Sequence, residues 1–214
     1  MTPKLAKVLA LTGMVTAATV MAGCGSYVRD GKSPARLVIN SMQAASGAEP
    51  NRMGSFLLSD VVTNVTTGGS CTVDNPCPSR FNDPGQVELR LQLRDIGSEA
   101  NPTSPSALNA VTISQYHVKY VRADNHNVEG VDVPYAFDGA IAVTVPSDGS
   151  VTTGFQLVRN VAKREAPLSA LAASSDTLIT VIAEVTFYGR DQAGNDVSVT
   201  GKIEITFGNF GDPS

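Results

Sequence analysis

The chain has no tryptophan, only two histidines and only three cysteines among its 214 residues. It also lacks an excess of basic residues, since 16 lysines and arginines stand against 20 acidic residues and give a formal net charge of -4. Nucleic-acid binding proteins gain affinity from clustered Lys and Arg, which release counterions from phosphates. The charge balance therefore argues against a nucleic-acid partner and against broad electrostatic adhesion to anionic lipid headgroups.

Recognisable catalytic motifs are also missing. The sequence contains no GxSxG motif whose serine could act as a nucleophile with His117 or His126 as its base. It also contains no glycine-rich phosphate loop. Loop carboxylates such as Asp83 and Asp95 are expected to be solvated surface groups. We therefore expect a protein that is not an enzyme; a hydrolase site assembled from distant segments is the alternative that a motif search leaves open.

The N-terminal segment has the parts of an export signal. Lys4 and Lys7 provide a positive start, and residues 8–20 form an apolar run that is too short to span a bilayer comfortably. Small residues follow at the expected cleavage position. Residues 1–23 are therefore predicted to be a signal peptide that is removed from the mature protein.

The end of this segment, Met21-Ala22-Gly23-Cys24, resembles the lipobox of bacterial lipoproteins. The resemblance implies cleavage before Cys24 and attachment of acyl chains such as palmitate to that cysteine, so that the protein is held at a membrane. Gly25 is not the aspartate that this family links to inner-membrane retention, so the outer membrane is favoured if the organism has two membranes. Ordinary secretory cleavage after Ala22 is the alternative.

The other two cysteines, Cys71 and Cys77, flank a turn-rich segment of an exported chain. Oxidising compartments allow disulfides to persist, so we predict a Cys71–Cys77 bridge. Closing so small a loop is worth roughly 2 kcal/mol in the chain-entropy description. A redox or metal role is the alternative, although no histidine lies near and the spacing is not CxxC.

The rest of the chain divides into a lipidated tether over residues 24–36 and one domain over residues 37–210. The domain is dominated by apolar residues with a period of two, separated by clusters of Gly, Pro, Asn, Asp and Ser. Strands are clearest at 87–94 and 197–207. A short helix is expected at 166–173, and further strands are expected at 36–42, 56–65, 111–122, 140–145, 151–158 and 178–188.

Two of these strands carry irregularities. The apolar phase changes within 111–122, which predicts either a bulge or a strand that crosses between sheets. Gly201 interrupts the apolar face of the last strand, which predicts a bulge or a close backbone approach. Short strands joined by turns, with almost no helix, predict an all-β antiparallel two-sheet sandwich of about 7–9 strands.

The last hairpin carries a resemblance to a known family. Its turn, Asp191-Gln192-Ala193-Gly194-Asn195, resembles the turn that closes the final hairpin of bacterial immunoglobulin-like domains. The resemblance covers about 30 C-terminal residues and implies an immunoglobulin-like topology for the sandwich. A tight hairpin needs residues such as Gly194 and Asn195 in any family, because both tolerate positive φ.

Oxygen-rich loops are the candidate ligand sites. Asp191, Asn195 and Asp196 gather in the last hairpin, and a second group gathers in a loop at 124–132. Calcium prefers six to eight oxygen ligands, so either loop could contribute to a calcium site, although turn formation alone also explains these residues. No cofactor is expected, and calcium is the alternative.

Four aromatic residues allow two interpretations: either they pack in the core, or they form an exposed platform for a glycan. Core packing is favoured, because platforms of this kind prefer tryptophan. These residues are Tyr116, Tyr120, Tyr135 and Phe137.

The sequence thus predicts a lipid-anchored cell-envelope protein with a non-catalytic binding or structural role. Its membrane contact is the lipid anchor, and its expected partner is another envelope protein, bound through loops or an edge strand. A module that binds a glycan or calcium is the alternative. The sequence does not identify a small-molecule ligand.

Overall fold

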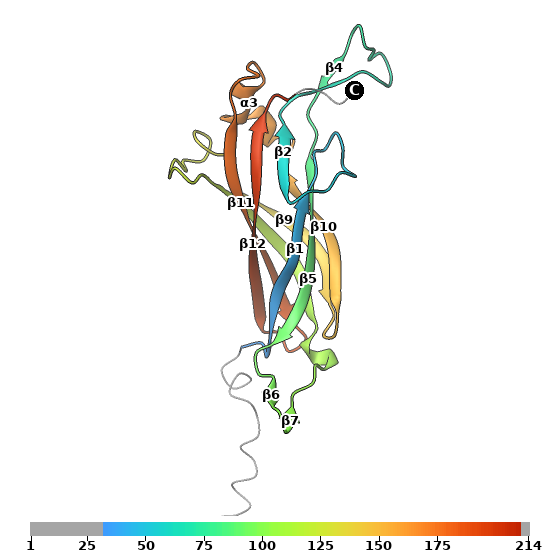
Figure 1. The fold of residues 1–214 in the computed structure, drawn as a ribbon, viewed down its shortest axis with the longest axis vertical. Helices are drawn as coiled ribbons and strands as arrows, with labels where there is room; N and C mark the ends of the chain where they lie inside the picture. The colour runs from blue at the N-terminus through green and yellow to red at the C-terminus, as the bar shows by residue number, and fades with distance from the viewer. Residues whose placement is uncertain (1–31, 211–214) are drawn as a thin grey trace, which may run out of the picture.

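The computed structural model of the protein describes residues 32–210. The predicted signal peptide (1–23), the predicted lipidation site Cys24 and most of the predicted tether (24–36) lie outside the described residues. The described part is elongated and consists almost entirely of strands (Figure 1). Within residues 32–210, no helix has the length and apolar character needed to cross a membrane.

Two main sheets make up the fold, and their eight strands overlap the eight that the sequence predicts. The predicted strand 56–65 is wrong in its extent, because the strand ends at Asp60 and residues 63–65 belong to a separate small sheet. The smaller sheet has the order β1-β5-β10, and the larger has the order β2-β12-β11-β8-β9. One of the sheets is curled into a half-barrel. The strands are β1 (Ala35–Ala44), β5 (Asp83–Leu93), β10 (Ser150–Val158), β2 (Phe56–Asp60), β12 (Asp196–Gly208), β11 (Ile179–Asp191), β8 (Val111–Val121) and β9 (Phe137–Val145).

Shorter elements lie at the two ends of the molecule. β3 (Thr63–Val65) pairs with β4 (Cys77–Ser79), and β6 (Gly97–Ser98) pairs with β7 (Asn101–Pro102). Figure 1 shows β4 near one end of the long axis and the β6–β7 hairpin at the other. The helical turns are η1 (Ala107–Asn109), η2 (Ala162–Arg164) and α3 (Leu168–Leu171), the last within the helix predicted at 166–173.

Of the two predicted irregularities, the one within 111–122 is present as a bulge, whereas Gly201 lies at neither a bulge nor a close backbone approach. The register of β8 against β9 shifts between Ile113 and Gln115, so the phase change is a bulge and the strand stays in one sheet. The register of β11 against β12 runs through Gly201 without a shift. A Cβ at Gly201 would collide with the side chains of Met42 and Ile39 from β1, so side chains of the facing sheet fill the space beside this glycine.

The prediction of a purely antiparallel sandwich is wrong at one edge, because β2 pairs with β12 in parallel. The chain leaves β1, crosses to the other sheet through residues 45–55 and continues in the same direction (Figure 1). Since β12 also runs toward that end, the pairing must be parallel. The remaining pairings within the two main sheets are antiparallel.

Aromatic residues form the centre of the core and join the sheets. Tyr116 of β8 contacts Phe155 of β10 in an edge arrangement, with 5.5 Å between ring centroids, and Phe155 lies 5.3 Å from Phe187 of β11. Tyr120 of β8 is buried, and its hydroxyl donates a hydrogen bond of 2.7 Å to the carbonyl of Leu157 in β10. A buried hydroxyl needs such a partner, so Tyr120 fixes the larger sheet against the smaller one.

Candidate functional site

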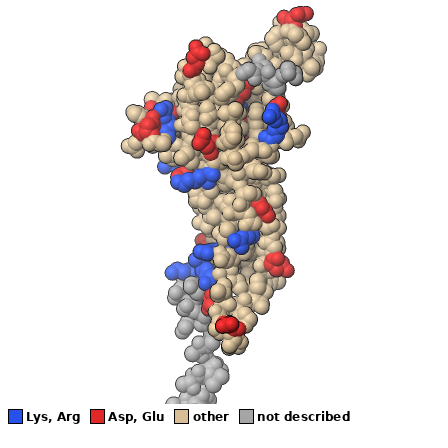
Figure 2. Space-filling view, in the orientation of Figure 1, with Lys and Arg blue, Asp and Glu red and all other residues tan. Residues whose placement is uncertain are grey.

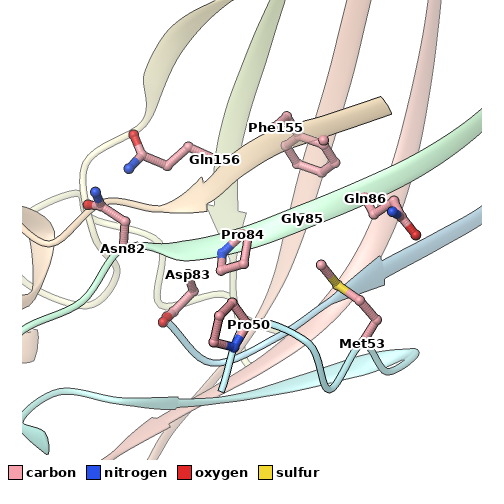
Figure 3. A pocket seen from close by; sticks show the side chains of 10 residues that line it. Pro50, Met53, Asn82, Asp83, Pro84, Gly85, Gln86, Phe155 and Gln156 are labelled. Carbon is pink, nitrogen blue, oxygen red and sulfur yellow. The ribbon is translucent and has the colours of Figure 1, made fainter. Parts of the chain in front are cut away.

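A pocket of about 490 Å³ lies where the β1–β2 connection meets strands β5 and β10. Pro50 and Met53 come from the connection at 45–55 and face Pro84 of β5, as Figure 3 shows. The walls are therefore mainly apolar, and amide side chains stand around them. The lining residues are Pro50, Met53, Asn82, Asp83, Pro84, Gly85, Gln86, Gly154, Phe155 and Gln156.

Two glycines on adjacent strands shape this pocket in different ways. At Gly85, an added Cβ would come within 2.5 Å of Cζ of Phe155, so the ring fills the space that a side chain would take. Gly154 is exposed, and a Cβ added there would have only an ordinary contact, at 3.8 Å from the Gly85 carbonyl oxygen. The pocket is thus open above Gly154 because this residue has no side chain.

Hydrogen bonds attach the 45–55 connection to the beginning of β5. The amide of Ala45 donates to the Pro84 carbonyl at 3.1 Å, and the amide of Gly47 donates to Oδ1 of Asp83 at 2.8 Å. Ala44 and Gly54 exchange backbone hydrogen bonds of 2.9 and 2.8 Å, which close the base of the connection. The apolar wall formed by Pro50 and Met53 is therefore part of the folded domain.

Asp83, at the edge of the pocket, takes part in a buried ion pair. Its Oδ1 accepts a hydrogen bond of 2.9 Å from Nζ of Lys163, and its Oδ2 accepts one of 2.6 Å from the hydroxyl of Ser59. The Asp83 and Lys163 side chains are 0% and 1% exposed. The expectation that Asp83 is a solvated loop carboxylate is wrong. The alternation of inward and outward residues along β5 could have predicted the burial of Asp83, because Asp83 is on the same face of the strand as the buried Val87 and Leu89.

Burial changes the protonation equilibria around this ion pair. It raises the pKa of Asp83, while the Lys163 ammonium and the hydrogen bonds from Lys163, Ser59 and Gly47 oppose the increase. Burial, together with the nearby Asp83 carboxylate, also raises the pKa of Tyr120, which therefore stays a neutral donor. Because Asp83 and Lys163 are closed to solvent, we assign the pair a structural role in joining β5, β2 and η2.

The last hairpin brings together two of its three candidate calcium ligands. Oδ1 of Asp191 accepts hydrogen bonds of 2.9 Å from the amides of Ala193 and Asn195, and its Oδ2 accepts one of 2.9 Å from Nδ2 of Asn195. Asp196 instead pairs with Arg190 at 2.7 Å. The Asp191 carboxylate thus stabilises the turn itself, and Gly194 adopts the positive φ, +87°, that the turn requires.

Burial alone would raise the pKa of Asp191, but hydrogen bonds from Asn195, Ser33 and Ala193 outweigh it and hold this pKa below its usual value. Across residues 32–210, no three His, Cys, Asp or Glu side chains are grouped so that they could hold a metal ion. Calcium binding at this hairpin stays a prediction.

The second oxygen-rich loop, between β8 and β9, is also held by its own hydrogen bonds. Asn127 accepts a bond of 2.6 Å from the amide of Arg122, and Asp132 accepts one of 3.0 Å from the amide of Val128. This loop follows the end of β8, whereas the last hairpin lies beside the beginning of β8, since Asp191 pairs with Val111. The two groups of oxygens therefore lie at opposite ends of the fold.

The two histidines lie on the surface beside carboxylates. Nδ1 of His117, on β8, is 2.9 Å from Oδ1 of Asp138, its register partner on β9. Nδ1 of His126 is 3.4 Å from Oδ2 of Asp124 in the β8–β9 loop. Both pairs are partly or largely exposed, as expected for a strand-surface histidine and a loop histidine.

The remaining sequence-based expectations have mixed outcomes. The Cys71–Cys77 disulfide is present, with 5.4 Å between Cα atoms, and it closes the loop between β3 and β4. Tyr116, Tyr120 and Phe137 are buried, so core packing is confirmed for these three aromatics. Core packing is wrong for Tyr135, which is exposed because it lies on the β8–β9 loop and not on a strand that faces the core.

Comparisons with known proteins assign no family to the chain. No protein-family model matches it, and no curated protein sequence matches it. Among solved structures, the X-ray structure of Northeast Structural Genomics Consortium target SoR45 aligns with 80% of this chain and 84% of that chain, at 8% identity and a TM-score of 0.33. A likeness at this level carries no functional argument.

Proposed function

We propose that this protein is a lipid-anchored cell-envelope protein whose immunoglobulin-like sandwich binds a protein partner without catalysis. The observation that carries the proposal is the apolar pocket above Gly154. The lipobox-like sequence before Cys24 supports the anchor, and Gly25 favours the outer membrane of an organism with two membranes.

The strand order supports the immunoglobulin-like topology. In such domains, strands A, B and E form one sheet, and strands G, F and C form the other, to which a C′ strand is added in some members. The order β1-β5-β10 corresponds to A-B-E, and β12-β11-β8-β9 corresponds to G-F-C-C′. The connection from β1 to β2 adds a strand that changes sheets, which is a known way to build the corner of a sandwich.

The chemistry of the pocket favours a peptide segment over a sugar. Its walls are formed by proline, methionine and phenylalanine side chains, and the amides of Asn82, Gln86 and Gln156 stand around them. Such a site can bury one apolar side chain of a partner, while the amides pair with the partner's backbone. A glycan platform would need several exposed aromatic faces, but three of the four candidate aromatics are in the core and Tyr135 alone among them is exposed.

Filling the pocket tests this proposal. In Gly154→Leu, the new side chain would occupy the pocket without a backbone clash, because the Cβ has only an ordinary contact. We expect affinity capture from cross-linked membrane fractions to recover a stoichiometric protein partner with the wild type and to lose it with Gly154→Leu. Thr152→Leu, which is exposed on the same strand outside the pocket lining, should keep the partner.

Equal recovery of the partner with both variants would place the binding surface elsewhere. If the wild type captures no partner above background, the ligand-binding alternative takes precedence. Calcium is then tested directly, since binding to the folded state raises the melting temperature by mass action. An unchanged melting temperature in millimolar calcium would remove calcium and leave a glycan as the ligand to test.

A further inference from the structure

Two large apolar side chains are exposed in the loop between β5 and β8. Ile96 is 72% exposed and Leu108 is 70% exposed. Ile96 lies at the base of the β6–β7 hairpin, where its carbonyl accepts a hydrogen bond of 3.0 Å from the amide of Thr103, and Leu108 lies in η1. The two side chains are therefore presented by elements with defined backbone structure.

This loop lies beside the point at which the described chain begins. The amide of Arg94 donates a hydrogen bond of 2.9 Å to the Pro34 carbonyl, and Nε of Arg94 donates one of 3.1 Å to the Ser33 carbonyl. Ser33 itself is buried. Figure 1 shows the beginning of β1 and the β6–β7 hairpin at the same end of the molecule. The chain is thus fixed to this end before β1 starts.

The distance to the predicted anchor is short. Eight residue steps separate Cys24 from Lys32, and a fully extended chain of this length reaches at most about 29 Å. A lipid on Cys24 would therefore keep this end of the domain within about 29 Å of the bilayer. The pocket residues lie at the beginning of β5, and an 11-residue strand is about 35 Å long.

We propose that the loop 94–110 lies against the headgroup region of the membrane that carries the anchor, with Ile96 and Leu108 inserted into it. This inference rests on the lipid anchor of the proposed function. Charges near the loop nearly balance, since Lys32, Arg36 and Arg94 stand against Asp95 and Glu99. The contact therefore depends on apolar burial and stays shallow, and it directs the pocket away from the membrane.

The absence of tryptophan allows a direct test. The full chain is expressed and processed in cells, extracted from membranes and reconstituted in phosphatidylcholine vesicles, with a single tryptophan in place of Ile96, Leu108 or Val131. Val131 is the matched control, because it is also exposed but lies in the β8–β9 loop at the other end. The probe is a nitroxide quencher attached to the lipid headgroup.

We expect Ile96→Trp and Leu108→Trp to lose about half of their fluorescence in quencher vesicles, with emission shifted to the blue, while Val131→Trp is unchanged. If all three tryptophans are equally unquenched in protein that floats with the vesicles, the loop does not contact the membrane and the inference is wrong. If the wild-type chain does not float with vesicles, the lipid anchor is wrong and the inference fails with it.

Discussion

At the residue scale, the pair Asp83 and Lys163 has the largest expected effect on stability. Breaking a buried pair leaves one charge without its partner, which costs about 3–5 kcal/mol, whereas an exposed pair contributes about 1 kcal/mol or less. Both side chains are almost completely buried, and the pair joins segments that are 80 residues apart in the chain. The expected consequence is a strong dependence of the fold on Lys163.

Lys163→Met should therefore lower the free energy of unfolding by about 3–5 kcal/mol at pH 7, as measured by urea denaturation. Without the ammonium, burial raises the pKa of Asp83 further above its value in the unfolded chain. The folded state then takes up a proton as the pH falls, so the destabilisation should become smaller between pH 7 and pH 5.

The matched control for this variant is Arg52→Met, which removes an ion pair with Glu49 whose arginine side chain is 80% exposed. It should cost about 1 kcal/mol or less. A Lys163→Met penalty no larger than that of the control, or one that grows as the pH falls, would contradict the structural role given to the pair.

The pKa of Asp191 is shifted in the opposite direction to that of Asp83, so its contribution to stability is lost only at a lower pH. Its carboxylate accepts hydrogen bonds from the closing turn, and Asp191→Ala should cost about 1.5–3 kcal/mol at pH 7. Because the pKa of Asp191 is lowered in the folded state, this contribution is present above the unfolded value of about 3.9 and is lost as the pH falls through the folded value.

Urea denaturation at pH 7 and pH 3 checks this prediction, and the difference between wild type and Asp191→Ala should shrink at pH 3. Asp196→Ala is the control, because the Asp196 carboxylate is exposed and pairs with the exposed Arg190. If both substitutions cost the same at pH 7, the turn does not depend on the Asp191 carboxylate.

At the element scale, periodicity predicted the strands well, because each strand has one inward and one outward face. All eight strands of the two main sheets were expected, and the bulge in β8 is one of the two forms that the change of phase allowed. The direction of β2 could not be predicted, since a period of two does not say which strand lies alongside or in which direction. The parallel pairing follows from the route of the chain through 45–55.

The pocket was beyond prediction for a related reason. It exists where Gly154 lacks a side chain and where a distant connection is held near β5 by the Asp83 carboxylate. The sequence marks neither condition, because a glycine in a strand is equally consistent with a bulge. The three candidate calcium ligands lie in one hairpin, but the Asp196 side chain pairs with Arg190 and does not join Asp191, and calcium binding stays a prediction.

Two strand glycines provide a matched test of the packing. A Cβ at Gly139 of β9 would collide with the buried Tyr116 ring, whose hydroxyl accepts a hydrogen bond of 3.1 Å from the amide of Gln156. Gly139→Ala should therefore lower the free energy of unfolding by about 1–3 kcal/mol. Gly154→Ala should be neutral or stabilising by up to about 1 kcal/mol, since it also restricts the unfolded chain.

Thermal and urea unfolding of the two alanine variants decide this point. Since both variants make the same chemical change in a strand, the difference between them reports the space around each glycine. Equal stabilities would mean that the Tyr116 ring can move away from the new Cβ without a loss of stability. The packing between the sheets in this region would then be looser than the structure shows.

At the scale of the whole molecule, the two ends have different surroundings. One end carries the beginning of β1 and the loop with Ile96 and Leu108, and the other carries the pocket and the disulfide-closed loop. Lysine, arginine and acidic side chains are scattered over the visible face, and neither sign forms a continuous patch along it (Figure 2). We therefore propose that the anchor sets the orientation of the domain, that the pocket binds the partner, and that neither depends on net charge.

The proposed orientation and membrane contact depend on a lipid at Cys24, so the intact mass of the protein extracted from the membrane fraction tests the account most directly. We predict a chain that begins at Cys24 and carries the added mass of acyl chains, with two hydrogens fewer than the reduced form because of the Cys71–Cys77 bridge. An unmodified chain, such as one that begins at Gly23 after secretory cleavage, would contradict the account.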